Sequence, residues 1–385
     1  MTPPLEGIRI VDFSQFLAGP YASLKLLDMG ARVIKVENPK AGDLCRHIYL
    51  SDTKIHGEST LFHAINRGKE SIALDLKSPQ GLAAARTLIT HADLVIQNFR
   101  PGVIDRLGLG YEQVKAIKPD IIYGSISGYG DSGQWADLPG QDLLVQARSG
   151  IVWLSGNADQ GPVPIGLPIA DISAGANLAQ GLLGALFRKE RTGQGALVET
   201  SLLEALIDLQ FEFLTTYLNN DEIPPERAQK GSAHGYLPAP YGVFETARGH
   251  LALAMTPLDK LVNLLGLQED PRFASGSNAG FTHRNEIHAI LRSAFKTKSA
   301  EQWESLLIKH DIWCARILNW KEMLRTEAGK ALEMLLPDPE NTTTSLRHLR
   351  TPIRLDGQRA PSGPDAPELD AHGQAICEEF GISRI

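Results

Sequence analysis

The chain has 385 residues, of which 43% are hydrophobic and 22% charged, and its formal net charge is -7. This composition is that of an ordinary globular protein, and the length suits two domains or one large domain with an insertion. The acidic balance argues against broad binding to nucleic acid or to an anionic membrane surface, so we expect neither as a partner.

The cysteines and the N-terminal residues indicate the compartment of the protein and the kinds of site it can hold. Cys45, Cys314 and Cys377 lie far apart and form no CxxC pair, so the sequence predicts neither a disulfide framework nor a cysteine metal site. Residues 1–7 contain no basic region followed by an apolar core, and no apolar run approaches the length of a membrane span. We therefore expect a cytoplasmic protein without a bound metal.

The first segments follow a strand–helix–strand order. The β-branched run at residues 7–13 predicts a buried strand, residues 21–29 have helical spacing, and residues 31–37 predict a second strand. Two strands joined by a helix form a β-α-β unit, which favours a parallel sheet.

The same order continues to about residue 130, with a helix predicted at 79–91 and strands at 71–76, 93–98 and 121–126. We predict a Rossmann-like, doubly wound α/β domain, in which ligands bind at the carboxyl ends of the strands. Those ends carry Ser14-Gln15, Glu37-Asn38, Lys77, Asn98 and Ser127-Gly128. A nicotinamide site is not favoured, because residues 15–20 do not match the GxGxxG pattern that should follow the first strand.

Asp171 stands between a short apolar run and a helix-like segment of small residues at 174–188. This position predicts a carboxylate at the N-terminal end of a helix, where free N–H groups and the helix dipole favour an anion. Taken alone, the pattern favours a helix N-cap.

The second half of the chain predicts a smaller α+β domain. Residues 197–209 predict a strand and the start of a helix that runs to about residue 220, and residues 241–254 predict two strands joined at 247–249. Segment 351–355 is a candidate for one more strand that returns to the first domain, and 341–345 is predicted as an exposed loop. The predicted organisation is a large domain at 1–220, a linker at 221–235, a small domain at 236–327 and a returning C-terminal segment at 328–385.

Several short segments along nearly the whole chain form a family signature. Each segment alone is weak evidence, but together and in this order they are specific. The segments are residues 5–13 with Leu17-Ala-Gly-Pro20, residues 30–37, Leu74-Asp-Leu-Lys77, Asn98-Phe-Arg-Pro-Gly102 with Asp105-Arg-Leu-Gly108, residues 127–130, Gly193-Gln-Gly195 with Ser201-Leu-Leu-Glu204, and residues 239–244. In these residues the chain resembles the class III CoA-transferases, the family that includes formyl-CoA transferase and carnitine-linked CoA-transferase.

The resemblance implies that Asp171 is the nucleophile and that Gln15 lies near the thioester. A carboxylate suits this role, because its acyl adduct is a mixed anhydride that keeps the activation of the thioester, whereas a serine ester would lose it. An aspartate is also ionised at neutral pH without a partner base. The expected steps are attack on the acyl-CoA, return of CoA to Asp171 as an aspartyl-CoA thioester, and transfer to the acceptor acid. Each step passes through an oxyanion, for which the backbone of residues 15–18 is a candidate donor.

The resemblance also assigns positions that contact CoA and further properties. The CoA positions are Ala18, Lys77, Asn98, Phe99, Val103 and Arg106, with Arg46 as a further candidate. Gln146 and Arg148 are candidates to meet a second carboxylate of the substrate. The substrates implied are an acyl-CoA and a small carboxylic acid, with no permanently bound cofactor, and the assembly implied is a homodimer of interlocked chains.

Two other functions stay open at the level of sequence. The related α-methylacyl-CoA racemases use a histidine of a Gly-His-Asp motif as a second base, and the motif here reads Gly140-Gln-Asp142. Gln141 cannot accept a proton at neutral pH, so racemisation is the less favoured alternative. A catalytically silent CoA-binding protein is the third, and the setting of Asp171 argues against it.

Overall fold

The structure is a computed structural model that describes residues 2–48, 53–55, 57–273, 278–335, 346–359 and 363–383. The loop predicted at 341–345 lies outside these residues. The chain forms two compact units, of which unit 1 comprises Met1–Val145, Pro168–Leu209 and Leu332–Ile385, and unit 2 comprises Gln146–Leu167 and Gln210–Ala331. Residues 146–167 and 210–220, which we placed in the large domain, thus belong to unit 2. The predicted domain boundaries themselves stay a prediction.

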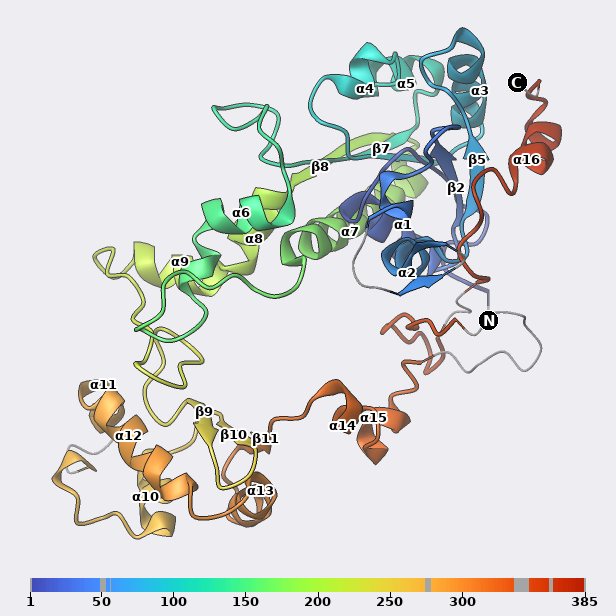
Figure 1. The fold of residues 1–385 in the computed structure, drawn as a ribbon. Helices are drawn as coiled ribbons and strands as arrows, with labels where there is room; N and C mark the ends of the chain where they lie inside the picture. The colour runs from blue at the N-terminus through green and yellow to red at the C-terminus, as the bar shows by residue number, and fades with distance from the viewer. Residues whose placement is uncertain are drawn as a thin grey trace. The chain divides into compact units, whose positions relative to one another are not determined.

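Unit 1 is built on a six-stranded sheet in the order β5-β2-β1-β6-β7-β8, and every neighbouring pair is parallel (Figure 1). The strands are β1 (Arg9–Asp12), β2 (Arg32–Glu37), β5 (Glu70–Ala73), β6 (Leu94–Gln97), β7 (Ile122–Ser127) and β8 (Ala196–Ser201). The predicted parallel α/β sheet is confirmed, and all carboxyl ends lie at one edge.

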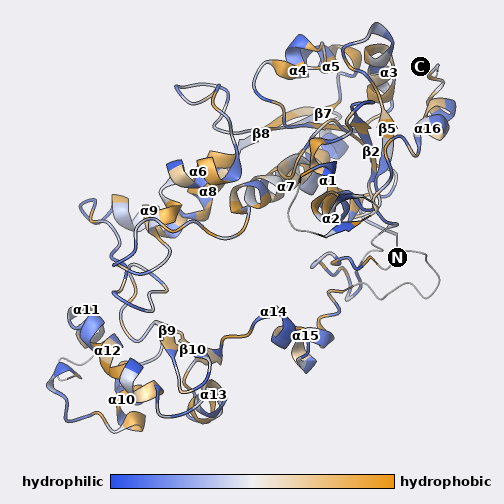
Figure 2. Ribbon diagram, viewed as in Figure 1, coloured by the Kyte–Doolittle hydropathy of each residue, from blue (hydrophilic) through white to orange (hydrophobic). Residues whose placement is uncertain are grey.

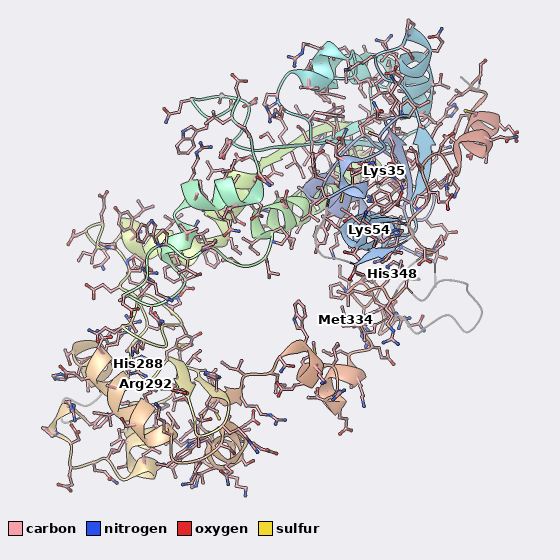
Figure 3. All side chains as sticks on the ribbon, viewed as in Figure 1. Lys35, Lys54, His288, Arg292, Met334 and His348 are labelled. Carbon is pink, nitrogen blue, oxygen red and sulfur yellow. The ribbon has the colours of Figure 1, made fainter. Side chains whose placement is uncertain are left out.

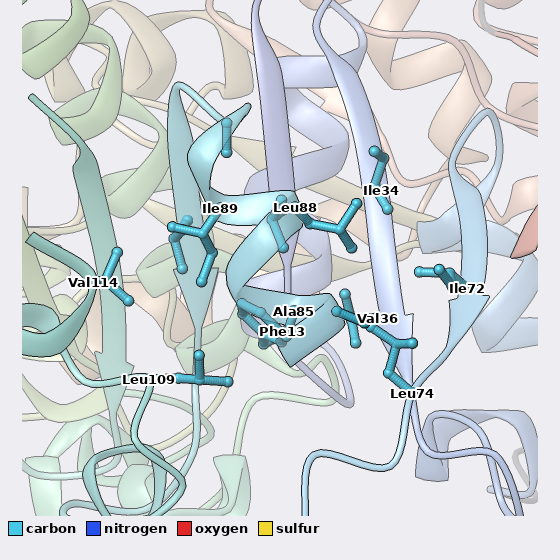
Figure 4. Close-up of a cluster of buried hydrophobic side chains, with 14 of the residues drawn as sticks. Phe13, Ile34, Val36, Ile72, Leu74, Ala85, Leu88, Ile89, Leu109 and Val114 are labelled. Carbon is cyan, nitrogen blue, oxygen red and sulfur yellow. The ribbon is translucent and has the colours of Figure 1, made fainter. Parts of the chain in front are cut away.

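One face of this sheet is covered by helices α3 (Pro79–Thr90), α5 (Tyr111–Ile117) and α16 (Gly373–Phe380). Buried β-branched and aliphatic side chains of the strands, such as Ile34 and Val36, pack there against Leu88 and Ile89 of α3 (Figure 4). The inner strands are rich in hydrophobic residues because both faces of a parallel sheet are buried. Hydrophobic residues are orange in Figure 2, as along β7.

Helices α1 (Ala18–Leu27) and α7 (Ile169–Thr192) cover the opposite face. Gly124 of β7 allows α7 to approach the sheet closely, since a Cβ there would stand 3.2–3.4 Å from Leu178 and Leu182. The two helices also pack on each other. Their common position brings the end of β1 and the start of α7 to the same side of the sheet.

Shorter elements complete unit 1. They are the hairpin of β3 (Lys54–Ile55) and β4 (Glu58–Ser59), the 3-10 turn η1 (Leu44–Arg46), and helices α2 (Thr60–Asn66), α4 (Val103–Arg106) and α8 (Leu202–Leu209). Helix α6 (Asp142–Ser149) begins in unit 1 and ends in unit 2.

Unit 2 contains an antiparallel sheet in the order β11-β10-β9, with bounds β9 (Gly242–Glu245), β10 (His250–Leu253) and β11 (Cys314–Arg316). The two strands predicted at 241–254 are confirmed, whereas β11 was not predicted. Phe244 and Leu251 pack against Phe295 and Trp303 in its core. The helices are α9 (Phe211–Leu218), α10 (Leu258–Leu265), α11 (Ala279–Thr282), α12 (Arg284–Phe295), α13 (Ala300–Lys309), α14 (Trp320–Met323) and α15 (Glu327–Ala331), with 3-10 turns η2 (Ile151–Trp153) and η3 (Pro271–Phe273).

Two local predictions were wrong. The helix expected to run to residue 220 ends at Leu209, and α9 starts anew after Gln210, whose buried side chain donates to the Ser149 carbonyl. No strand forms at 351–355, because Pro352 lacks an N–H and residues 355–358 turn back on themselves instead.

The C-terminal segment returns to unit 1 as helix α16 beside β5, where Asp370 accepts from the Ala73 N–H at 2.9 Å. Within the described residues, no helix combines the length and the apolar character that crossing a membrane requires.

Candidate functional site

Asp171 is the third residue of α7 and is only partly exposed. The residue before the helix is Pro168, which supplies no side-chain cap. The Asp142 Oδ2 accepts instead from the N–H groups of Ala170 at 2.7 Å and Asp171 at 3.2 Å. The alternative that Asp171 serves as the N-cap is therefore wrong, because another carboxylate takes that function.

Asp142 reaches α7 because the chain before it packs closely on the end of β7. Gly128 and Gly140 meet backbone to backbone, and a Cβ on either would stand 2.4–2.6 Å from the other's Cα. No residue with a side chain fits at either position without displacing the backbone. This contact fixes the start of α6, whose first residue is Asp142, opposite the first turn of α7.

The environment of Asp171 disfavours its charge. Burial raises its pKa from the usual range to about 7, and the neighbouring Asp142 carboxylate adds to the effect. Among the described residues, no side chain forms an ion pair or hydrogen bond with the Asp171 carboxylate oxygens. Asp171 is thus only partly ionised near neutral pH, which corrects the expectation that it would be fully ionised there. Its ionised form is weakly solvated and is not shielded by a cation, and both properties favour nucleophilic attack.

The loop after β1 lies at the same edge. The Asn98 side chain holds Gln15 from both sides, with its Oδ1 accepting from the Gln15 N–H at 2.8 Å and its Nδ2 donating to the Gln15 carbonyl at 2.7 Å. The Gln15 side chain itself is partly exposed. Two of the predicted site residues, from the ends of β1 and β6, are thereby joined.

Helix α1 begins directly after this loop and contacts α7 one turn beyond Asp171. A Cβ on Gly175 would lie 2.5 Å from the Ala18 carbonyl oxygen, so only glycine permits the approach. Leu17 packs in the same hydrophobic cluster as Ile172, the neighbour of Asp171. The structure therefore joins Gln15 to Asn98 and places Ala18 against α7 one turn from Asp171.

Residues 5–373 match the family model described as CoA-transferase family III. The chain belongs to this family.

The chain is similar to the succinate–glutarate CoA-transferase of Agrobacterium fabrum (strain C58 / ATCC 33970), with 37% identity covering 98% of this chain and 96% of the relative. The acetyl-CoA:oxalate CoA-transferase of Acetobacter aceti is 31% identical over the same shares. A crystal structure of a CAIB/BAIF family protein from Brucella suis matches with a TM-score of 0.86 at 33% identity, covering 99% of this chain and 100% of that one. The protein is thus a CoA-transferase.

The remaining CoA positions of this CoA-transferase lie along the same edge of the sheet. Lys77 is exposed after β5, while Val103 and Arg106 belong to α4, which starts at the left-handed Gly102 after β6. β2 and β1 separate β5 from β6 in the sheet, but all four strands end at the same edge, where exposed cations can contact phosphates. Their contact with CoA stays a prediction.

Phe99 is the predicted site residue that lines a cavity of about 340 Å³ at the carboxyl ends of β6 and β7. The cavity also holds Asp105, Asp131, Glu199 and Glu204 against one cation, Arg100. Burial and the neighbouring acids raise the pKa of the Glu199 carboxyl. This excess of acidic groups makes the cavity a poor site for a phosphate.

Two sequence-based candidates are already engaged within the fold. Arg46 is 2% exposed and pairs with Glu37 at 2.7 Å beneath the ring of Phe62, so it does not face CoA. Gln146 is buried and donates to the carbonyls of Ile165 and Leu167. Neither side chain is free to meet a substrate, whereas Arg148 is exposed.

Asp142 was not predicted as a neighbour of Asp171. The Gly140-Gln-Asp142 motif contains this signal, but it was interpreted only for a base at position 141. The buried acids and bases near Gln15 were not predicted either, since charged residues within strand-like runs give no sequence signal of their pairing.

Proposed function

We propose that Asp171 carries CoA between two carboxylic acids. The observation that supports this most strongly is an unpaired, partly buried carboxylate at the start of α7, released from capping by Asp142. A carboxylate that only stabilised the helix would itself accept from the first-turn N–H groups.

The reaction balances without a further reactant. An ionised Asp171 oxygen attacks the acyl-CoA carbonyl, and the C–S bond breaks to give a mixed anhydride and CoA thiolate. The thiolate attacks the Asp171 carbonyl carbon, which releases the donor acid as its carboxylate and leaves an aspartyl-CoA thioester. The acceptor carboxylate attacks this thioester, CoA leaves as thiolate, and its attack on the new acyl group regenerates Asp171.

The start of α1 is a candidate for stabilising the oxyanions. The N–H groups of Ala18 and Gly19 have no acceptor among the described residues. They lie at the helix end where backbone donors are free and the dipole favours negative charge. Donors fixed in this way stabilise charge that develops in the transition state.

Mass spectrometry of the peptide that contains Asp171 tests this proposal. The protein is incubated with succinyl-CoA and glutarate, then with acetyl-CoA and oxalate, because similar proteins are named for these acids. We expect an adduct on Asp171 with one donor and transfer of CoA to the paired acid. Asp171→Asn should abolish both, since an amide is not a nucleophile of comparable strength.

Asp259→Asn is the matched control, because this exposed acid also stands in the first turn of a helix that follows a proline. It should leave adduct and transfer unchanged. Full transfer by Asp171→Asn would refute the role of Asp171. Exchange of the α-proton of an acyl-CoA in deuterated water, without CoA transfer, would favour a racemase instead.

We also propose the homodimer that the resemblance implies. Each unit exposes large hydrophobic side chains. Phe187 and Ile207 in unit 1, and Phe211 and Leu218 in unit 2, are 45–70% exposed. Such side chains are typical of an interface between subunits.

A further inference from the structure

A loop with its backbone held by side chains connects β1 to α1. The Ser14 N–H donates to Asp12 at 2.9 Å, the Ser14 carbonyl accepts from Lys35 Nζ at 2.8 Å, and the Phe16 N–H donates to Asp43 Oδ1 at 3.1 Å. Together with the two bonds that Asn98 makes to Gln15, five successive backbone groups bind side chains. The conformation of this loop is therefore set by residues from elsewhere in the chain and not by a regular element.

Phe16 shows that this conformation is imposed. Its φ is 63, a left-handed value that costs a non-glycine residue about 1–2 kcal/mol, and its side chain is 45% exposed. Phe16 is only about half covered, so burial offsets this cost only in part. The bond from its N–H to Asp43 is the contact that holds the residue in place.

Asp43 is fixed in turn by a buried set of charges. Its Oδ2 lies 2.7 Å from Lys35 Nζ, and both side chains are 0% exposed; Lys35 is labelled on β2 in Figure 3. Its backbone N–H donates to Glu37 at 2.9 Å, and Glu37 is held by Arg46.

Three acids and three bases balance in this set: Asp12, Glu37 and Asp43 against Lys35, Arg46 and Lys69. A buried ion pair such as Asp43–Lys35 adds little net stability. Its presence therefore calls for an explanation other than stability.

We propose that Asp43, held by Lys35, is a positioning residue for CoA transfer, which sets the backbone of Gln15 and Phe16 and through it the start of α1 beside Asp171. The inference rests on the proposed function of Asp171. It explains why both carboxylate oxygens of Asp43 are engaged, since Oδ1 accepts from Phe16 and Cys45 while Oδ2 faces Lys35.

The Asp43→Asn variant tests whether Asp43 positions the loop for catalysis or only stabilises the fold. An amide has one acceptor oxygen, so it loses the contact either to Phe16 or to Lys35. We expect kcat for transfer from succinyl-CoA to glutarate to fall at least about tenfold, with KM for succinyl-CoA changed less than about threefold. A larger share of succinyl-CoA should also be hydrolysed, because a displaced loop admits water to the anhydride.

Asp28→Asn is the matched control, since Asp28 and Arg67 form an equally buried pair at the other end of α1, 2.7 Å apart and 3% exposed each. It should lower the thermal midpoint by a similar amount while kcat and the hydrolysed share stay near wild type.

The double variant Lys35→Met/Asp43→Asn removes both charges and leaves Asp12 paired with Lys69 and Glu37 paired with Arg46. Because Lys35→Met also removes the donor to the Ser14 carbonyl, the double variant should regain only part of the stability and should not regain kcat.

Wild-type kcat and hydrolysis in the double variant, or in a folded Asp43→Asn protein, would overturn the inference while the Asp171 adduct stands. If the wild-type protein forms no adduct and transfers no CoA, the proposed function fails first, and this inference fails with it.

Discussion

At the scale of single residues, the site depends on two carboxylates with different tasks. Asp142 caps α7 by accepting two backbone N–H groups, so the Asp171 carboxylate is not needed as a cap. The same neighbour raises the pKa of Asp171, and burial raises it more. A nucleophile with a pKa near the working pH combines a usable ionised fraction with high basicity.

This pKa predicts the pH dependence of the reaction. In the proposed reaction the ionised form of Asp171 is the reactive one, so kcat/KM for the acyl-CoA should rise about tenfold per pH unit below a break at about 7 and level off above it. Asp142→Asn keeps a capping oxygen but removes the negative charge, so the break should move to lower pH. Rates measured from pH 5 to 9 check both, and a flat profile would contradict the assignment.

At the scale of elements, the crossing of α1 and α7 brings the site together. The two helices follow β1 and precede β8, far apart in sequence, and they meet where Gly175 lies against the Ala18 carbonyl. Small residues in α7 therefore have a geometric purpose, since they let the loop that carries Gln15 approach Asp171.

Gly175→Ala should separate these helices. The new Cβ would stand 2.5 Å from the Ala18 oxygen, so we expect a loss of about 1–3 kcal/mol in stability and a fall in kcat as Gln15 moves away from Asp171. Gly184 of the same helix has no atom within 4 Å of its Cβ position, and Gly184→Ala should instead stabilise by up to about 1 kcal/mol. Thermal unfolding and CoA-transfer rates, measured for both variants, compare their effects on stability and on kcat. Equal shifts in the two variants would show that the crossing is not tightly packed.

The elements that the sequence predicted well are those with a local periodic signal. Strands β1, β2 and β6 are largely buried and rich in aliphatic residues, and the order of strands and helices along the chain predicted the parallel sheet correctly. Strand β11 has three residues with two of them exposed, so it lacks such a signal. Its formation depends on pairing with β10, which lies about sixty residues earlier.

The site was predictable only where a motif names its residue. Asp171 was predicted from its segment, and its catalytic role stays a prediction. The capping of α7 by Asp142 joins residues 28 or more positions apart and depends on three-dimensional contact. Arg46 was misjudged because an arginine in a polar loop reads as exposed, although Glu37 draws it into the interior. Contacts between distant charged residues are the part that sequence patterns do not encode.

At the scale of the whole molecule, the exposed hydrophobic side chains set an expectation for assembly. Phe187 at the end of α7 and Phe211 at the start of α9 are 65% and 70% exposed. Isolated exposed residues of this kind are common, but a dimer gives them a partner and explains why several are aromatic.

The protein should therefore be a dimer at micromolar concentration by light scattering and native mass spectrometry. Phe211→Asp should weaken the dimer at least about tenfold, because a charge would be buried without a partner at the interface. If Phe211 faced water in solution, the same change would alter stability by less than about 0.5 kcal/mol and leave the mass unchanged. Gln80→Asp, on the exposed surface of α3, introduces the same charge away from these side chains and should leave the dimer intact. A monomeric wild-type protein would contradict the proposed assembly, while CoA transfer by that monomer would show that one chain holds the complete site.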